Sequence, residues 1–279
     1  MITLQNLHTH STYCDGRNTP EETVRRALML GFDSVGFSEH APKPFCVNYA
    51  SMMEKNTQYR AEIARLKEAY RGQIEIFLGL EEEMYAGSDL SHYDYVIGSV
   101  HYLLIGGEYV GFECDIGDLL AIIDTHFGGD GMALARVYYE TLAHLPEYGR
   151  FDVVGHFDVI NKRCEKNGLF DMECAEYRSY ALEALQALAG KIPLAEINTG
   201  AMTRGHRTAP YPAPFLLKEW RARGGNIIIS SDCHSNQFLA HYFREAIELA
   251  ESCGYRETYV LTKDGFSHVS LEDMKRKLI

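Results

Sequence analysis

Asn226-Ile227-Ile228-Ile229-Ser230-Ser231-Asp232-Cys233-His234 is a short β-branched run that ends on two potential metal ligands. The run does not alternate between apolar and polar side chains, which is typical of a strand buried on both faces in a parallel sheet. Similar runs occur at residues 2–8, 34–38, 74–80, 95–100, 152–155 and 194–198, with a further short one at 258–261. The sequence therefore predicts a largely parallel sheet covered by helices.

Helix signals separate these strands. Thr19-Pro20-Glu21-Glu22 predicts a capping box with proline at the first helical position, and Gly31 marks the end of that helix. Ser51-Met52-Met53-Glu54 predicts a second capping box, for a helix that ends at Gly72. Further helices are expected at residues 172–189, 214–223 and 236–253, each followed by glycine, and after Ser270.

Strand–helix alternation repeated about seven times favours an α/β barrel with its active site at one mouth. A doubly wound open sheet is the structural alternative. Residues 102–150 depart from the alternation: a hairpin at 102–112 turns at Gly106-Gly107, and two helical segments flank residues 128–131. We interpret residues 102–150 as an insertion within a single domain that spans 1–279.

The composition excludes several classes of protein. Of the 279 residues, 46% are hydrophobic and 24% charged, which suits one large folded domain. No run of 18 apolar residues and no basic-then-apolar N-terminal segment occurs, so we expect neither a membrane span nor a secretory signal. The net charge of -12 disfavours binding to nucleic acid or to an anionic membrane, and seven scattered cysteines without a CxxC motif indicate reduced thiols in a cytoplasmic protein.

Histidine and carboxylate side chains gather at the ends of the predicted strands. His8 and His10 have the i, i+2 spacing that points both side chains in one direction, and Asp232 and His234 repeat it. The other strand ends carry His40, Glu81, His101 and His156. The carboxyl ends of barrel strands face one mouth, so these side chains should meet there. Imidazole and carboxylate ligands suit Zn, Mn or Fe.

Each of these signals has a simpler reading when taken alone. An isolated pair such as His8 and His10 is more often a surface or structural pair than a metal site. The triplet Glu81-Glu82-Glu83 is compatible with a solvated loop. The shared placement at strand ends is what favours a metal centre over these readings.

The motifs resemble the PHP superfamily (polymerase and histidinol phosphatase). The opening motifs are His8-Thr9-His10-Ser11-Thr12, Asp15-Gly16 and Ser38-Glu39-His40. The later motifs follow in the family's order: Gly79-Leu80-Glu81, Ser99-Val100-His101, Gly155-His156 and Ser231-Asp232-Cys233-His234. The stretch from Tyr93 to His101 and the run Glu196-Ile197-Asn198-Thr199 are similar to the histidinol-phosphatase branch.

The resemblance implies a distorted (β/α)7 TIM-like barrel that holds three divalent metal ions, with Zn, Mn and Fe left open. The implied ligands of the first ion are His8, His10, Glu81 and Asp232. Glu81 would bridge to a second ion bound by His101 and His156, and the third would take Asp15, His40 and His234.

The implied activity is phosphomonoester hydrolysis, with L-histidinol phosphate as substrate in histidine biosynthesis. The alternatives are a PHP phosphoesterase for another small phosphate ester or a nucleotide, and a noncatalytic PHP binding or regulatory domain. An amidohydrolase-type barrel also carries an HxH motif, but the order of the later motifs fits the PHP family better. The sequence does not indicate the oligomeric state.

Further residues are candidates for contact with the substrate. Protonation of the leaving group is assigned to Asp232, His234 or the non-ligand His206. Phosphate binding is expected from arginines, which suit bidentate contact with phosphate: Arg163, Arg204, Arg207 and Arg17. A cationic amine on the substrate could face Glu82, Glu83 or Glu113.

Overall fold

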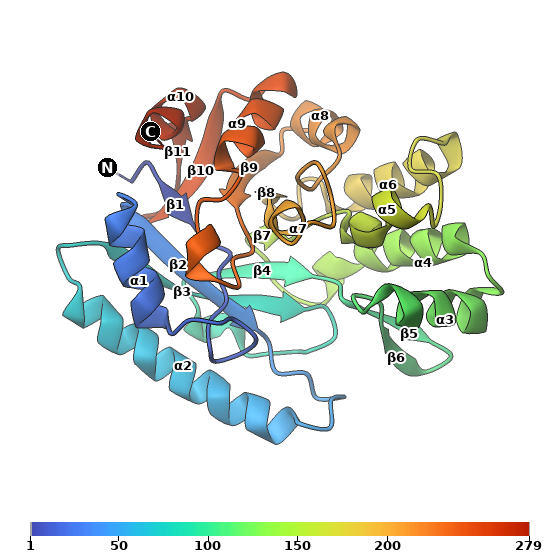
Figure 1. Ribbon diagram of the computed structural model, residues 1–279, viewed down its shortest axis with the longest axis horizontal. Coiled ribbons are helices and arrows are strands. Elements are labelled where there is room, and N and C mark those ends of the chain that lie inside the picture. Colours follow the sequence, from blue (N-terminus) through green and yellow to red (C-terminus); the bar gives the residue numbers. More distant parts are fainter. Residues whose placement is uncertain (1, 279) are drawn as a thin grey trace.

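The computed structural model describes residues 2–278, and seven parallel strands form its central sheet in the order β1-β2-β3-β4-β7-β8-β9 (Figure 1). Their bounds are β1 (Gln5–Asn6), β2 (Ser34–His40), β3 (Glu75–Glu83), β4 (Tyr95–Ser99), β7 (Val153–Val154), β8 (Leu194–Asn198) and β9 (Asn226–Ser230). The seven predicted barrel strands are thereby confirmed, although β1 and β7 are shorter than expected.

The first and last strands join just beyond their ends, which closes the sheet into a distorted barrel. The backbone N–H of His10 donates to the carbonyl of Cys233 at 2.9 Å, and the N–H of Cys233 donates to the carbonyl of His8 at 3.0 Å. An open doubly wound sheet would leave these two edges apart, so the predicted barrel is confirmed and the open-sheet alternative is wrong.

Helices surround the barrel, with α1 and α2 on one side and α5 and α6 on the other (Figure 1). The helices are α1 (Pro20–Met29), α2 (Tyr49–Ala69), α5 (Cys164–Asn167), α6 (Ala175–Leu188), α7 (Gly200–Thr203), α8 (Pro214–Ala222), α9 (Phe243–Ser252) and α10 (Leu271–Lys277). Short 3₁₀ turns occur at η1 (Leu90–His92), η2 (Leu145–Glu147), η3 (Val159–Arg163) and η4 (Asn236–Phe238).

Two helix predictions need correction. The capping box at residues 51–54 is wrong, because α2 begins at Tyr49 after Asn48, whose side chain makes no capping hydrogen bond. The helix expected over 236–253 is divided into η4 and α9, because Tyr242 between them has φ of 61°. The capping box of α1 at Thr19 and the cap of α10 at Ser270 are confirmed.

The interior of the barrel is filled around Tyr95 of β4. Its hydroxyl donates to the carbonyls of Leu7 and Phe37, the latter at 3.0 Å. Gly36 and Gly79 make room for the ring, since a Cβ on Gly79 would lie 2.2 Å from Cζ of Tyr95. The barrel is therefore a packed core, and the space for function is at its mouth.

The last predicted strand lies outside the barrel sheet. β10 (Glu257–Thr262) pairs only with β11 (Gly265–Ser270), in an antiparallel hairpin. Gln5 of β1 holds this hairpin at the amino-terminal end of the barrel, because its amide donates to the Leu261 carbonyl at 2.9 Å and accepts from the Leu261 N–H at 2.7 Å.

Between β4 and β7 lie the hairpin β5 (Tyr102–Ile105) and β6 (Glu108–Gly111), followed by α3 (Ile116–Phe127) and α4 (Gly131–Ala143). The predicted turn is confirmed, and Gly106 and Gly107 both have positive φ. We propose that these elements are an insertion within one domain spanning 1–279, of which the first and last residues lie outside the described part.

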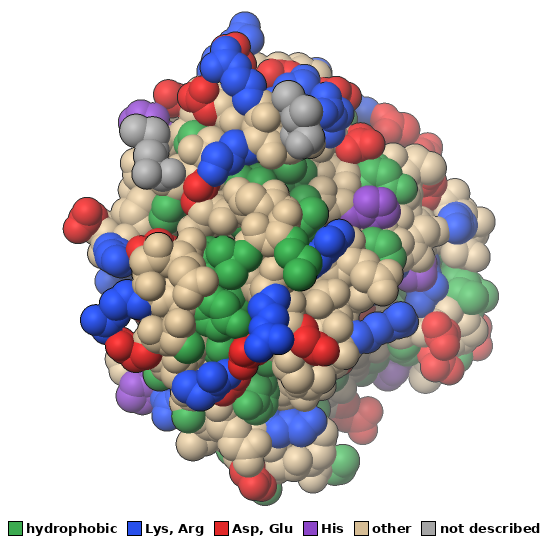
Figure 2. Space-filling model, turned by 60° about the vertical axis from the view of Figure 1, so that its left-hand side comes forward, with side chains coloured by type: hydrophobic (Ala, Val, Ile, Leu, Met, Phe, Trp, Pro, Cys, Tyr) green, Lys and Arg blue, Asp and Glu red, His purple; other side chains and the backbone are tan. Residues whose placement is uncertain are grey.

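Figure 2 shows one face, on which hydrophobic side chains gather in the middle and charged side chains lie around them. Among the helices of the described residues, none combines the length and the apolar character that a bilayer crossing requires.

Candidate metal centre

The predicted ligands meet at the carboxyl-terminal mouth of the barrel because of the strand register. His40 at the end of β2 lies opposite Glu81 in β3, and Thr9 lies opposite Cys233, which brings His8 and His10 beside Asp232 and His234. The cavity at this mouth has a volume of about 360 Å³. Its lining residues are Asp15, His40, Lys43, Glu81, His101, Tyr102, Glu113, His156, Lys162, Arg204, Asp232 and His234.

Glu81 is the centre of the ligand cluster, and its Oε2 atom faces three histidines. Oε2 lies 2.8 Å from Nδ1 of His40, 3.4 Å from Nε2 of His8 and 3.5 Å from Nε2 of His10. Asp232 completes this side, with Oδ1 at 3.3 Å from Nε2 of His10 and 3.7 Å from Nε2 of His8. The four residues implied for the first metal ion are therefore brought together.

The other oxygen of Glu81 faces a second pair of histidines. Oε1 lies 3.0 Å from Nε2 of His156 and 3.3 Å from Nε2 of His101. Ser99 donates to the same oxygen at 2.9 Å. One carboxylate thus lies between two histidine groups, as a bridging ligand must.

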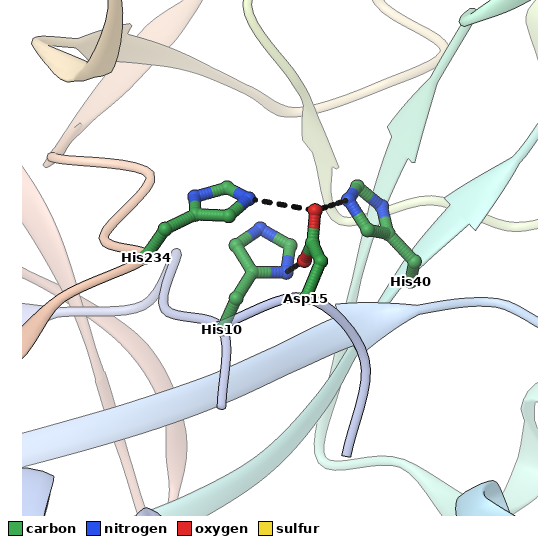
Figure 3. A group of neighbouring side chains, drawn as sticks. All are labelled: His10, Asp15, His40 and His234. Atoms are coloured by element: carbon green, nitrogen blue, oxygen red, sulfur yellow. Dashed lines mark hydrogen bonds and ion pairs between the residues drawn. The ribbon is translucent and has the colours of Figure 1, made fainter. Parts of the chain in front are cut away.

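Asp15 forms a third group at the edge of the cavity. Figure 3 shows Asp15 between His234 and His40, with His10 beside it. Oδ2 of Asp15 lies 3.2 Å from Nε2 of His234 and 3.6 Å from Nε2 of His40. Asp15 is exposed, unlike the buried ligands of the first group. The nine predicted ligands therefore form one cluster.

The hydrogen bonds of the buried ligand atoms indicate whether a cation fits this cluster. Nε2 of His8, Nε2 of His10 and Oε2 of Glu81 are buried and make no hydrogen bond within the described residues. An unpaired buried polar atom costs about 1–3 kcal/mol, so three that face one another indicate a missing partner. Groups spaced to hold a metal ion include His8, His10 and Asp232, and also His40, Glu81 and His101. These donors fit divalent cations.

Without an ion, some of the ligands are already in the form that binds metals and others must first release a proton. Burial would raise the pKa of Glu81, but the neighbouring His8, His40 and His101 outweigh it and hold the pKa well below its usual range. Burial, together with His234 and His40, lowers the pKa of His10 to about 3. Glu81 is thus ionised and His10 neutral near pH 7, which are the forms that bind metals. Burial would lower the pKa of His8, His40 and His101, but neighbouring carboxylates outweigh it and raise all three, so a bound cation would displace protons from these histidines.

Two buried glutamates accept hydrogen bonds from histidines of the ligand cluster. Glu196 of β8 accepts hydrogen bonds from Nδ1 of His8 at 2.8 Å and from the backbone N–H of His156 at 2.5 Å. Glu83 accepts from Nδ1 of His101 at 3.0 Å. Such carboxylates fix the orientation of a metal-binding imidazole. Sequence reasoning missed this role, although Glu83 lies two residues after Glu81 and so shares its face of β3.

Arg204 is the predicted phosphate-binding arginine that reaches the cavity. Its Nη2 donates to Oδ2 of Asp232 at 2.7 Å, and its Nη1 donates to the Asp232 carbonyl at 3.1 Å. Burial would lower the pKa of Arg204, but the Asp232 carboxylate outweighs it and raises the pKa. A permanent positive charge therefore stands next to the metal ligands.

Arg163 and Arg17 do not line the cavity, contrary to the sequence-based expectation. The guanidinium of Arg163 donates to the Cys114 carbonyl from Nε at 3.2 Å and from Nη2 at 3.0 Å. Arg17 is exposed in the loop after His10 and contacts His234 through its backbone N–H. Arg163 is thus engaged by the insertion, and Arg17 points to solvent.

Arg207 and His206 also lie outside the cavity lining. Nη1 of Arg207 lies 3.7 Å from Oδ2 of the buried Asp158, and its guanidinium lies 4.6 Å from the centroid of the Tyr211 ring. Burial and the nearby Arg163 lower the pKa of His206 to about 4. A neutral imidazole away from the cavity is poorly suited to donate a proton to a leaving group.

Several residues of the cavity wall lie outside the strand ends that carried the sequence signal for the metal ligands. Nζ of Lys162 lies 3.1 Å from Oε1 of Glu113, and this pair faces the metal ligands. Burial would raise the pKa of Glu113, but Lys162 outweighs it and the pKa falls to about 2. Lys43 lies over the Tyr102 ring, 5.9 Å from its centroid. Of these four residues, only Glu113 was anticipated near the substrate.

Comparison with known proteins places the chain among metal-dependent phosphatases. The sequence profile of the PHP domain matches residues 6–200. A probable histidinol-phosphatase of Deinococcus radiodurans is 30% identical over 92% of this chain and 96% of its own length. The histidinol-phosphatase of Bacillus subtilis is 25% identical over 86% of this chain and 97% of its own length.

Solved structures share the fold. A histidinol phosphate phosphatase from Lactococcus lactis, complexed with zinc, L-histidinol and phosphate, has a TM-score of 0.68 and 21% identity. The match covers 96% of this chain and all of that one. A putative histidinol phosphatase from Listeria monocytogenes has a TM-score of 0.73 and 19% identity, and the match covers 86% of this chain and 99% of that one.

Proposed function

The chain belongs to the PHP domain family, and from this premise we propose that it is a metal-dependent phosphomonoesterase that hydrolyses L-histidinol phosphate to L-histidinol and phosphate. The observation that carries the proposal is the carboxylate of Glu81, whose two oxygens face two separate histidine groups at the barrel mouth. The relatives named histidinol-phosphatase support the substrate.

The ligand cluster would hold three divalent cations, with Zn, Mn and Fe as the candidate metals. The first would take His8, His10, Glu81 and Asp232, the second Glu81, His101 and His156, and the third Asp15, His40 and His234. Such ions, when bound, lower the pKa of a water ligand and neutralise the charge on phosphate oxygens. Glu196 and Glu83 would keep His8 and His101 in the orientation that binds metal.

The cationic side chains of the cavity would bind the phosphoryl group. Arg204 presents a rigid guanidinium beside Asp232, and Lys43 and Lys162 add charge at the rim. These groups stand where negative charge grows during hydrolysis, and they need little reorganisation because Arg204 is already held.

Asp232 and His234 are the proposed groups for proton transfer to the leaving alcohol. They line the cavity next to Arg204, and Nδ1 of His234 lies 3.3 Å from Oδ1 of Asp232. Burial would raise the pKa of Asp232, but Arg204 outweighs it and holds the carboxyl ionised, so Asp232 would first take the proton that the attacking water loses and then pass it to the alcohol. Glu113 also lines the cavity and would accept the amine of the substrate.

The proposed substrate also indicates the pathway and the compartment in which the reaction would take place. Hydrolysis of histidinol phosphate would be a step of histidine biosynthesis in the cytoplasm, and the partner would be a small phosphate ester, with no nucleic acid. A noncatalytic PHP domain is disfavoured because every implied ligand position is filled and the ligands converge.

A panel of phosphate esters tests the proposal. The protein is stripped of metal, reconstituted separately with Mn, Zn, Fe or Co, and assayed for phosphate release from histidinol phosphate, a sugar phosphate, a nucleotide and a simple alkyl phosphate. We expect the highest kcat/KM with histidinol phosphate. A metal-loaded enzyme that ignores histidinol phosphate and hydrolyses another ester would move the chain to a different phosphoesterase activity.

A further inference from the structure

A second cavity opens off the metal centre, between the first half of α2, the end of β2 and the loop after His10. Its volume is about 220 Å³. Its lining residues are Tyr13, Cys14, Asp15, Glu39, His40, Lys43, Asn48, Ser51, Met52, Lys55, Asn56 and Tyr59. Asp15, His40 and Lys43 also line the main cavity, so the two spaces are neighbours. We call this second space the side cavity.

The side cavity is lined by a buried carboxylate that the proposed mechanism does not use. Glu39 is only 2% exposed, and neither carboxylate oxygen makes a hydrogen bond within the described residues. Cys14 and Ser11 are close to this carboxylate, but neither meets hydrogen-bond geometry. Buried carboxylates are costly without a partner, so Glu39 indicates a ligand that donates a hydrogen bond.

A buried hydrogen-bond donor also lines the side cavity. Asn56 Oδ1 accepts from the Tyr93 hydroxyl at 3.0 Å, but Asn56 Nδ2 is buried without a partner among the described residues. The side cavity therefore combines an unmet acceptor on Glu39 with an unmet donor on Asn56. A ligand that satisfies both needs one donor and one acceptor in a single small group.

The remaining walls suit a flat ring. The Tyr59 hydroxyl is occupied by the carbonyls of Phe37 at 2.9 Å and Gly79 at 2.8 Å, so Tyr59 offers its ring rather than its hydroxyl. Tyr13 and Met52 add an aromatic and a polarisable surface. Lys43 stands where the two cavities meet, beside the place proposed for the phosphoryl group.

We propose that the side cavity binds the imidazole ring of the substrate alcohol. This inference rests on the proposed function and adds to it the site that selects the leaving group. An imidazole is flat, and its two nitrogens supply one donor and one acceptor. One ring nitrogen donates to Glu39 and the other accepts from Nδ2 of Asn56, while the phosphoryl group stays with Arg204 in the main cavity. Esters without such a ring forgo both hydrogen bonds.

Filling the side cavity from the surface tests the inference without disturbing the core. Ser51 is exposed on α2 and lines the side cavity, so the indole of Ser51→Trp would occupy it. Gln58→Trp is the matched control, because position 58 is exposed on the same helix and lines neither cavity. Glu39→Gln removes the negative charge and replaces one acceptor oxygen with an amide donor at almost constant size, with metal content measured alongside.

Steady-state kinetics with histidinol phosphate and ethanolamine phosphate give the expected outcome. Ser51→Trp and Glu39→Gln should each raise KM for histidinol phosphate about tenfold or more, with kcat/KM for ethanolamine phosphate and the metal content unchanged. Gln58→Trp should match the wild type on both esters. An unchanged KM for histidinol phosphate in Ser51→Trp would overturn the inference and leave the proposed function standing.

If the wild type releases no phosphate from histidinol phosphate, the proposed function is wrong. Calorimetry with L-histidinol then tests separately whether the side cavity binds the imidazole ring. Binding of L-histidinol to the wild type that Ser51→Trp abolishes and Gln58→Trp retains would support the side cavity. Equal binding to all three proteins, or binding to none of them, would reject it.

Discussion

The two ends of the barrel both carry charged side chains around a cavity, but only one end leaves its buried polar atoms unpaired. The amino-terminal end has the larger space, about 650 Å³, and its charges are matched. Lys67 lies 2.6 Å from Asp94, and Lys263 lies 2.9 Å from Glu75. At the carboxyl-terminal mouth, the smaller cavity of about 360 Å³ contains buried nitrogens and oxygens without hydrogen-bond partners in the described chain.

The comparison shows that buried polar atoms without hydrogen-bond partners, and not the volume of the cavity, identify the functional site. Ion pairs at the amino-terminal end are partly exposed and contribute little beyond solubility and modest stability. The mouth holds buried atoms of Glu81 and its histidines without hydrogen-bond partners among the described residues, at a cost in folding free energy that a bound cation would offset. Mutations of the metal ligands should therefore impair activity strongly, whereas mutations at the amino-terminal end should have little effect on activity or stability.

Glu81→Gln should give the largest effect. The amide keeps the size of the side chain but not its charge, so kcat/KM should fall by about 1000-fold, together with the metal content of the purified protein. Glu82→Gln is the control, because Glu82 follows in the chain yet accepts from the Ser88 N–H at 2.8 Å and lines neither site cavity. Full metal content and activity in Glu81→Gln would contradict the conclusion that the mouth, and not the amino-terminal end, holds the functional site.

Arg204→Ala should give the next largest effect. Loss of the guanidinium beside Asp232 should lower kcat/KM by about 100-fold with the metal content intact, since a charge that stabilises the reacting phosphoryl group is removed. Arg163→Ala should change kcat/KM less than about threefold, because its guanidinium is held by the Cys114 carbonyl. Equal losses in the two variants would argue against Arg204 as the phosphate-binding residue.

Arg207→Leu should affect stability rather than chemistry. Removing this partner leaves the Asp158 carboxylate buried, so the free energy of unfolding in urea should fall by about 3 kcal/mol. The folded fraction should keep wild-type kcat/KM with histidinol phosphate. A loss of kcat/KM at unchanged stability would return Arg207 to the phosphate-binding residues.

Lys67→Ala at the amino-terminal end should give the smallest effect. The ion pair with Asp94 is about one-third exposed, so unfolding free energy should change by less than about 1 kcal/mol and activity should not change. Urea unfolding and phosphate release measure both quantities. A substantial loss of activity would show that this end of the barrel also takes part in function.

The sequence predicted most of the barrel and the ligands at its strand ends. His8, His40, Glu81, His101 and His156 follow from local rules, because alternation within a strand and the common direction of parallel strands determine where such side chains point. Asp15 has no strand to orient it, and its assignment depended on the family resemblance. The family and the fold are confirmed by the comparisons and by the closed sheet.

The rest depends on contacts that the sequence does not encode locally. Arg204 and Arg207 lie three residues apart, yet one faces the cavity and the other faces Asp158. Lys43 and Lys162 come from connections whose path is set by tertiary packing. The triplet Glu81-Glu82-Glu83 was compatible with a solvated loop, but all three side chains are buried because β3 extends through them.

Metal stoichiometry measured together with phosphate release tests the central claim most directly. The purified protein is stripped with a chelator, titrated with Zn or Mn, and analysed for bound metal and for turnover of histidinol phosphate at each step. We predict that activity is lost on stripping and returns as the chain takes up three metal ions. Turnover that persists in fully stripped protein, or a chain that binds less than one ion after reconstitution, would contradict the account.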